Sequence, residues 1–311
     1  MSDAKLSALL DRLESGRRLN AKSLIVSVFG DAILPHGGSV WLGSLVQMLA
    51  LFGINERGVR TSVFRLAKEG WFTAQPVGRR SYYALTRSSR LRFEAAHRTI
   101  YAAGPRAWDG MWTVVFTGLF EALPRERLRT DLAWQGFGQI VPGVMLHPAP
   151  DEAALRQSLK DAGAAEESPV MRGSAAGWMD ADGVRGIVAR AWNLTDLAAH
   201  YEAFLADFRP LLRALDNGKP SPQACFRLRT LLIHHYRRAL LRDPGLPDEL
   251  LPPHWPGAAA RLLCRNLYRL VHEGAEVYLA RTLETADGPL PDADQSYFER
   301  FGGLAPLEGA A

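Results

Sequence analysis

The sequence predicts an α+β protein of three successive parts, and three observations carry this prediction. A basic helix followed by a short hairpin lies within residues 55–85. From residue 112 the pattern is strand, helix, two strands, a second helix and a weaker strand. From Leu194 onward long amphipathic helices dominate. We expect parts at 1–98, 105–180 and 185–311, because Gly104, Pro105 and Gly110 mark a break after the first.

Length and composition favour a globular protein. The chain has 311 residues, enough for two or three domains. No apolar run reaches the roughly 18–20 residues that a membrane span needs. The N-terminal residues are charged and amphipathic, unlike a signal peptide. The two cysteines, Cys225 and Cys264, form no disulfide or metal framework. We therefore expect a cytoplasmic protein.

The charge is spread unevenly along the chain. Residues 1–98 contain 15 Lys and Arg against 7 Asp and Glu, a net charge of +8. The remaining residues carry a net charge of −4. This asymmetry indicates an N-terminal nucleic-acid module and a remainder with other tasks.

The segment from Asn55 to Trp71 predicts a helix with two different faces. Asn55 is a good N-cap, and Gly70 is a typical stop. At about 100° per residue, one side is apolar or small. It contains Val59, Ser62, Val63, Leu66 and Ala67. The other side carries four cations and a hydroxyl without a carboxylate: Arg57, Arg60, Thr61, Arg65 and Lys68, with Phe64 at its centre.

Two interpretations of this basic face stay open. It suits the DNA major groove, where Arg reads guanine and cations neutralise phosphate. It also fits an amphipathic helix whose charges are merely solvated. For Phe64 the alternatives are contact with a thymine methyl group and packing against the hairpin that follows.

The segments before this helix predict two further helices. Residues 21–29 are apolar enough for a buried helix, and 30–38 form a turn that contains Pro35, Gly37 and Gly38. Residues 40–42 form a short strand. Ser44 is the expected N-cap of a helix over 45–52, which Gly53 ends. Two helices joined by a short glycine-containing turn have helix-turn-helix spacing.

A hairpin with a cationic tip follows. Strands are expected at 71–74 and 81–85, with Arg79 and Arg80 at the turn between them. Its position directly after a basic helix favours a winged helix-turn-helix over an ordinary surface hairpin. Arg79 and Arg80 would contact phosphate or the minor groove. Tyr82 and Tyr83 point to opposite sides of the strand, so one belongs to the core and the other, assigned as Tyr83, can bond a phosphate.

The middle of the chain has the element order of a ferredoxin-like α/β sandwich. A strand starts at Trp112 and runs to Leu119, and a helix opens near Pro124. Two strands flank Pro142 and Gly143, a second helix covers 151–164, and a weaker strand falls at 168–172. Such a sheet leaves one face open, which another subunit often covers, so we expect a homodimer built on this domain.

With these segments assembled, the chain resembles the PaaX family of transcriptional repressors over nearly its whole length. The residues that carry the resemblance include SVFGDAILPHGGSVWLGSL, ERGVRTSVFRLAKEGWF, GRRSYYALT, LAWQGFG, LLIHHYRRALLRDPGLPDELLPPHW and YFERFGGL. The resemblance implies a dimer that represses a phenylacetate or related aromatic-acid operon from a palindromic operator. It also implies release by phenylacetyl-CoA, with no resident cofactor.

A cluster in the helical third part has the residue types that a coenzyme A thioester requires. Arginine suits phosphates, and Trp or Tyr suits rings. The cluster consists of His234, His235, Tyr236, Arg237, Arg238, His254 and Trp255. Burial at a helix interface is the commonest alternative for such residues. Adjacent histidines on a helix diverge by about 100°, which disfavours a shared metal ion.

An enzyme is the alternative class: one that acts on an acyl-CoA or a nucleotide and carries the winged helix for docking. The central domain is also similar to that of small CRISPR-adaptation nucleases, which place an Asp at the end of the first strand. Here that strand contains none, and Asp109 precedes it. No phosphate-binding loop or hydrolase motif occurs. We therefore predict no catalytic and no metal-binding residues.

Overall fold

The computed structural model describes residues 3–15, 19–104, 107–163, 170–215 and 220–304. The chain divides into two compact units. Unit 1 comprises Met1–Ala103, Glu202–Leu240 and Ala258–Ala311, and unit 2 comprises Gly104–Tyr201 and Leu241–Gly257. Among the described helices, none combines the length and the apolar character needed to cross a bilayer. This division differs from the one expected from sequence, since most of the C-terminal helices belong to the same compact unit as the N-terminal residues.

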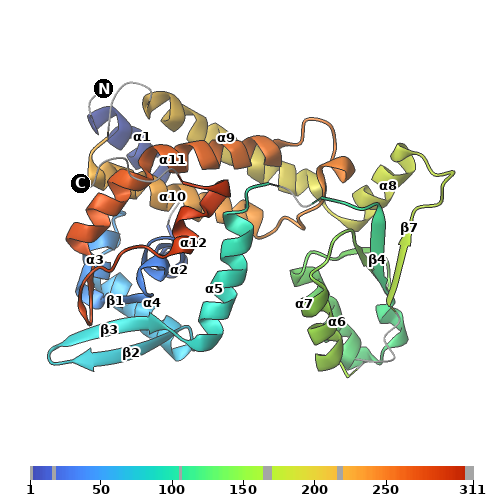
Figure 1. The fold of residues 1–311 in the computed structure, drawn as a ribbon, viewed down its shortest axis with the longest axis horizontal. Helices are drawn as coiled ribbons and strands as arrows, with labels where there is room; N and C mark the ends of the chain where they lie inside the picture. The colour runs from blue at the N-terminus through green and yellow to red at the C-terminus, as the bar shows by residue number, and fades with distance from the viewer. Residues whose placement is uncertain (1–2, 16–18, 105–106, 164–169, 216–219, 305–311) are drawn as a thin grey trace. The chain divides into compact units, whose positions relative to one another are not determined.

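Unit 1 begins with helices around a small antiparallel sheet in the order β1-β3-β2. The elements are α1 (Asp3–Ser15), α2 (Ala21–Val28), β1 (Ser39–Trp41), α3 (Leu42–Ala50), α4 (Glu56–Lys68), β2 (Phe72–Val77), β3 (Arg80–Leu85) and α5 (Arg87–Ile100). The hairpin of β2 and β3 extends away from the helices of this unit (Figure 1). Helices α2 and α3 both pack on α4, which is thereby held against the core along one side.

The C-terminal part of unit 1 is helical and packs on these elements. It contains α10 (Pro222–Leu240), α12 (Gln295–Phe298), the short strands β8 (Glu284–Thr285) and β9 (Gly288–Pro289), and most of α9 (Leu194–Leu215) and α11 (Pro256–Thr282). Ser221 caps α10, since its Oγ accepts the Ala224 N–H at 3.3 Å. Helix α10 contacts α1, α2 and α5. In the C-terminal segment the side chains of Tyr297 and Phe301 are buried, whereas Phe298 is exposed.

Three local predictions for unit 1 were wrong. The segment 30–38 is not simply a turn: a π-helical stretch, Phe29–Ile33, prolongs α2, and Asp31 within it is buried and pairs with Arg229 and Arg300. Ser44 lies inside α3 and accepts the Glu284 N–H at 3.1 Å. Strand β2 continues through Pro76, which costs no ladder hydrogen bond because β2 is an edge strand.

Unit 2 is built on a four-stranded sheet in which all neighbours are antiparallel. Its elements are β4 (Met111–Val115), α6 (Ala122–Trp134), β5 (Gly138–Val141), β6 (Val144–His147), α7 (Glu152–Asp161), β7 (Val170–Ser174) and α8 (Ala181–Ala191). The strand order is β5-β6-β4-β7. Strand β4 ends earlier than expected, because a 3₁₀ turn over Thr117–Leu119 brings the Gly118 N–H to the Gly143 carbonyl at 3.0 Å. The expected strand at 168–172 starts at Val170, and residues 168 and 169 lie outside the described residues.

Both faces of this sheet carry apolar clusters. On one face Val115 and Met145 pack with Leu128 of α6 and Leu155 of α7. On the other, one cluster unites Trp112, Leu146, Val188, Leu246 and Leu250. The face expected to lie open is thus partly covered by the same chain, through α8 and the 246–250 segment. Helix α8 was not among the elements expected from sequence, and Asp180 caps it by accepting the Gly183 N–H at 2.8 Å.

Candidate nucleic-acid interface

Helix α4 has well-formed ends. The Asn55 side chain accepts the Gly58 N–H at 2.9 Å, which satisfies a donor of the first turn. At the other end Gly70 has φ +76°, and its N–H bonds the Ala67 carbonyl while the Trp71 N–H bonds that of Leu66. These two bonds form a Schellman motif. Both predicted ends of the helix are confirmed.

The two faces of α4 differ as the sequence predicted. Val59, Val63 and Leu66 are fully buried. The opposite face is exposed along its whole length: Arg57, Arg60, Thr61, Phe64, Arg65 and Lys68. Phe64 is 67% exposed, so the alternative in which it packs against the hairpin is not observed. A large apolar side chain surrounded by exposed cations is available to a partner surface.

The face is not entirely free of carboxylate. Glu56 Oε1 lies 2.7 Å from Arg60 Nε, in an ion pair across one helical turn. Both side chains are more than half exposed, so this pair contributes only about 0.3–0.5 kcal/mol. A phosphate can therefore compete for Arg60 at little cost. Arg57, Arg65 and Lys68 form no ion pair with another described residue.

The hairpin tip is narrower than the sequence predicted. Gly78 and Arg79 form a two-residue turn in which Gly78 has φ +60°. Arg79 is exposed at the tip. Arg80 is the first residue of β3; it pairs with Glu284 of β8 and lies 4.5 Å above the centre of the Trp41 ring. Arg79 is thus the cation presented by the tip, while Arg80 is held by its own chain.

The two tyrosines of β3 separate as expected. Tyr82 is buried in the core of unit 1. Tyr83 is half-buried on the other side of the strand and pairs with Val40 and Ala74 of the neighbouring strands. Of the two, only Tyr83 has part of its surface available to a ligand.

The core of unit 1 contains a buried charge network that was not predicted from the sequence. Its anion is Asp31, which lies 2.9 Å from Arg229 Nε and 3.2 Å from Arg300 Nη1. Tyr101 and Tyr268 donate hydroxyl hydrogen bonds to Asp31 Oδ1 at 2.7 and 3.0 Å. We call these five residues the Asp31 network. It joins the end of α2 to α5, α10, α11 and the C-terminal segment.

A second carboxylate, that of Glu276, balances the second of the two buried arginine charges. Glu276 pairs with Arg229 Nη1 at 2.5 Å and with His36 Nε2 at 2.9 Å. Burial alone would raise the pKa of Glu276, but Arg229 and His36 outweigh burial and hold it at about 2. The two buried arginines thus face two carboxylates, those of Asp31 and Glu276.

The predicted effector cluster is divided between the two units. His234, His235 and Tyr236 are buried on α10, and His234 Nδ1 lies 2.8 Å from Ser27 Oγ. Burial, with the nearby charges of His235 and the adjoining arginines, lowers the pKa of His234 to about 3.

The remaining members are more exposed. Arg237 donates to the carbonyl and hydroxyl of Ser23 at 3.0 Å each, and Arg238 is exposed. His254 and Trp255 belong to unit 2, where Trp255 makes an edge contact with Tyr201. Within a single unit, therefore, these residues do not form one site, and their effector role stays a prediction.

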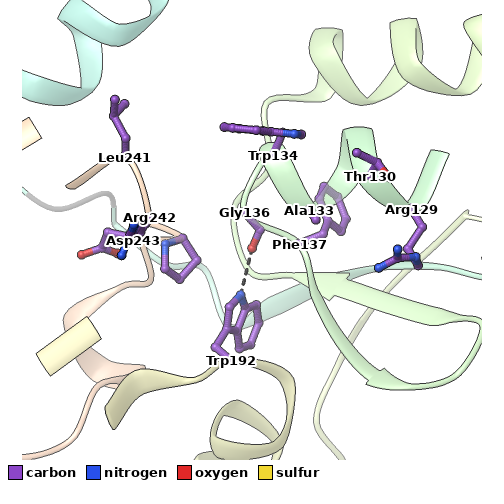
Figure 2. A pocket seen from close by; sticks show the side chains of 11 residues that line it. Arg129, Thr130, Ala133, Trp134, Gly136, Phe137, Trp192, Leu241, Arg242 and Asp243 are labelled. Carbon is purple, nitrogen blue, oxygen red and sulfur yellow. Dashed lines mark hydrogen bonds between the residues drawn. The ribbon is translucent and has the colours of Figure 1, made fainter. Parts of the chain in front are cut away.

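Unit 2 contains a hollow that the sequence analysis missed (Figure 2). Its volume is about 360 Å³. The residues that line it come from α6, from Gly136 and Phe137 after that helix, from Trp192 directly after α8, and from positions 241–244. In the sequence, the hollow is indicated only by Trp134, a large aromatic residue at the end of a charged helix.

These features define an α+β protein that presents a capped basic helix and a basic hairpin from one unit. Three family models match the chain: PaaX-like protein over residues 20–89, PaaX protein central Cas2-like domain over 105–184, and PaaX-like protein C-terminal domain over 192–281. The transcriptional repressor PaaX of Escherichia coli (strain K12) is 37% identical over 303 residues, which are 97% of this chain and 96% of that protein. The chain belongs to the PaaX family.

One solved structure shares the fold. The uncharacterized protein Rv0674 from Mycobacterium tuberculosis superposes with a TM-score of 0.53 and 22% identity, covering 83% of this chain and 98% of that one. At this identity the likeness concerns the fold alone.

Proposed function

We propose that this protein is a cytoplasmic transcriptional repressor that binds operator DNA through a winged helix-turn-helix in unit 1. The observation that carries the proposal is the exposed face of α4, with Arg57, Arg60, Arg65 and Lys68 on a helix whose opposite face is buried. Arginine can bond guanine in two places at once, and each cation can replace a counterion on phosphate. The relative from Escherichia coli is named a transcriptional repressor, which supports this role.

The arrangement around α4 supports the winged-helix assignment. Helix α3, the turn after it and α4 form the helix-turn-helix, with α4 as the recognition helix. The hairpin of β2 and β3 is the wing, and Arg79 at its tip would reach phosphate or the minor groove. Tyr83 supplies a hydroxyl on the same hairpin.

We further propose that unit 2 is a ferredoxin-like domain and that the repressor acts as a homodimer. The strand order and the two helices of one face support the fold assignment. A two-fold dimer matches a palindromic operator, whose half-sites lie about 34–36 Å apart. The released state would be favoured by phenylacetyl-CoA or a related aromatic acyl-CoA, and the regulated operon would serve aromatic-acid catabolism.

Release requires two global states of the dimer. The effector must bind the DNA-incompetent state more tightly than the DNA-bound one. A coupling of about 1–3 kcal/mol would change operator affinity about 5- to 150-fold, and operator DNA would weaken effector binding by the same factor.

The test is a gel-shift titration with the DNA upstream of the protein's own coding region. The wild-type chain should bind it, and scrambling one half of the palindrome should weaken binding. The Arg60→Ala/Arg65→Ala variant should lose about 1–3 kcal/mol for each arginine that reads a base. The control is Arg185→Ala in unit 2, an exposed arginine with an Asp182 partner one turn away. Equal affinity of the double variant and the wild type would remove α4 from the interface.

A further inference from the structure

The hollow in unit 2 is built from segments that lie far apart in the sequence. Its volume of about 360 Å³ is within the range of small-molecule sites, about 300–1,000 Å³. Gly136 and Pro244 bring the two sides together: a Cβ on Gly136, which has φ +90°, would lie 2.8 Å from the Pro244 oxygen. His147 Nε2 also lies 3.2 Å from that oxygen. The segment at Gly136 and the segment at Pro244 are therefore in direct contact without a ligand.

Aromatic rings line two sides of the hollow. Trp134, the last residue of α6, is 82% exposed, which is unusual for so large an apolar side chain. Trp192 lies below it in Figure 2, and its Nε1–H donates to the Gly136 carbonyl at 2.9 Å. Trp192 also stacks with Trp112 at 6.3 Å between centroids. The Trp192 ring is thus held by contacts within unit 2, whereas the Trp134 ring is exposed.

Two arginines flank these rings from opposite sides (Figure 2). Arg129 of α6 is held by Glu126 Oε2 at 3.0 Å. Arg242 Nη1 lies 2.7 Å from His200 Nε2, whose Nδ1 is 2.6 Å from the Asp196 carbonyl. A histidine that donates through Nδ1 accepts at Nε2, so it orients Arg242 without adding charge.

The carboxylate in the wall is already bonded. Asp243 accepts the Tyr201 hydroxyl at 2.6 Å and the Gly245 N–H at 2.7 Å. Both oxygens of Asp243 thus accept hydrogen bonds from its own chain. Arg129 and Arg242 line the hollow and have guanidinium donors besides those bonded to Glu126 and His200. The site therefore favours an anion, and its rings favour a flat partner.

We propose that this hollow binds an anion that carries a flat aromatic ring. The ring lies against Trp134 and Trp192, and the anionic group bonds Arg129 or Arg242. An arylcarboxylate and the nucleotide end of a coenzyme A thioester share this chemistry. As a binding site the proposal stands without DNA binding; as the site of the effector it rests on the function proposed above.

The experiment is isothermal calorimetry on the full chain with three probes: phenylacetate, free coenzyme A and phenylacetyl-CoA. The variants are Trp134→Ala and Arg242→Gln, both at exposed positions. The matched controls are Trp178→Ala, which removes an 85% exposed tryptophan outside the hollow, and Arg185→Gln. Each pocket variant should weaken binding about tenfold or more, and each control should leave it unchanged.

The probes distinguish the two sources of the ligand. Binding of phenylacetate alone places an arylcarboxylate in the hollow, and binding of free coenzyme A places the nucleotide there. If the wild type binds none of the three probes, or if both pocket variants bind like the wild type, the inference is wrong. Gel shifts on the same proteins test DNA binding separately from ligand binding. If the wild type does not bind operator DNA, the repressor proposal is wrong, and the calorimetric result for the hollow still holds.

Discussion

Unit 1 uses arginine in two opposite settings. On α4, Arg57 and Arg65 are exposed and form no ion pair with another described residue. In the core, Arg229 and Arg300 are fully buried and face Asp31 and Glu276. An exposed guanidinium keeps its donors for a partner, whereas a buried one needs its charge balanced by the fold. Whether an arginine of unit 1 can bind a partner or stabilises the core therefore depends on its burial and on the carboxylates around it.

The largest expected effect concerns the buried setting. In the Asp31→Ala variant, Arg229 and Arg300 lose the anion that they share. Breaking a buried pair costs about 3–5 kcal/mol of unfolding free energy, because the remaining charge stays desolvated. Urea unfolding followed by circular dichroism measures this loss.

The matched control for this prediction is an exposed pair in unit 2. The Asp182→Ala variant, which removes the partner of Arg185, should change stability by less than about 1 kcal/mol. If Asp31→Ala is as stable as that control, the Asp31 network does not hold unit 1 together.

A smaller effect should appear as the pH falls. The pKa of His234 is lowered from 6.5 to about 3, chiefly by burial. Below pH 6.5 His234 is therefore protonated in the unfolded chain but stays neutral in the folded chain. As a result, the free energy of unfolding decreases as the pH falls from 6.5 toward 3. At pH 5 this amounts to about 2 kcal/mol for His234.

Thermal unfolding between pH 8 and 5 measures this slope. His97, whose pKa burial and Arg300 lower to about 4, adds in the same direction. The His234→Gln variant should show a shallower pH dependence than the wild type. An identical pH dependence in the two proteins would show that His234 takes up protons in the folded state.

The exposed arginines of α4 could be predicted from the sequence, whereas the buried arginines of the Asp31 network could not. The α4 face could be predicted because Val59, Val63 and Leu66 repeat with the helical period, and Asn55 and Gly70 mark the ends. The Asp31 network could not, because its members lie at positions 31, 101, 229, 268 and 300, and only packing brings them together.

The hollow in unit 2 escaped prediction for a related reason. Arg129 and Trp134 share α6, but Trp192 and Arg242 come from distant segments. Ser44 shows a different error, because this residue was expected to cap a helix but lies within α3. The N-cap of α3 is Trp41, whose backbone is extended, and the Ser44 hydroxyl oxygen accepts the Glu284 N–H. Local rules predict local structure, and they fail where a distant residue competes for the same group.

The salt dependence of operator binding distinguishes cations that contact DNA phosphates from cations that do not. The claim is that the exposed cations of α4 bind DNA. The slope of log K against log salt should fall by about one for each phosphate contact removed, so the Arg57→Ala/Lys68→Ala variant should lose about two. The control Arg185→Ala/Lys160→Ala removes the same charge from exposed positions in unit 2 and should keep the wild-type slope. Equal slopes for the α4 variant and the wild type would contradict the account.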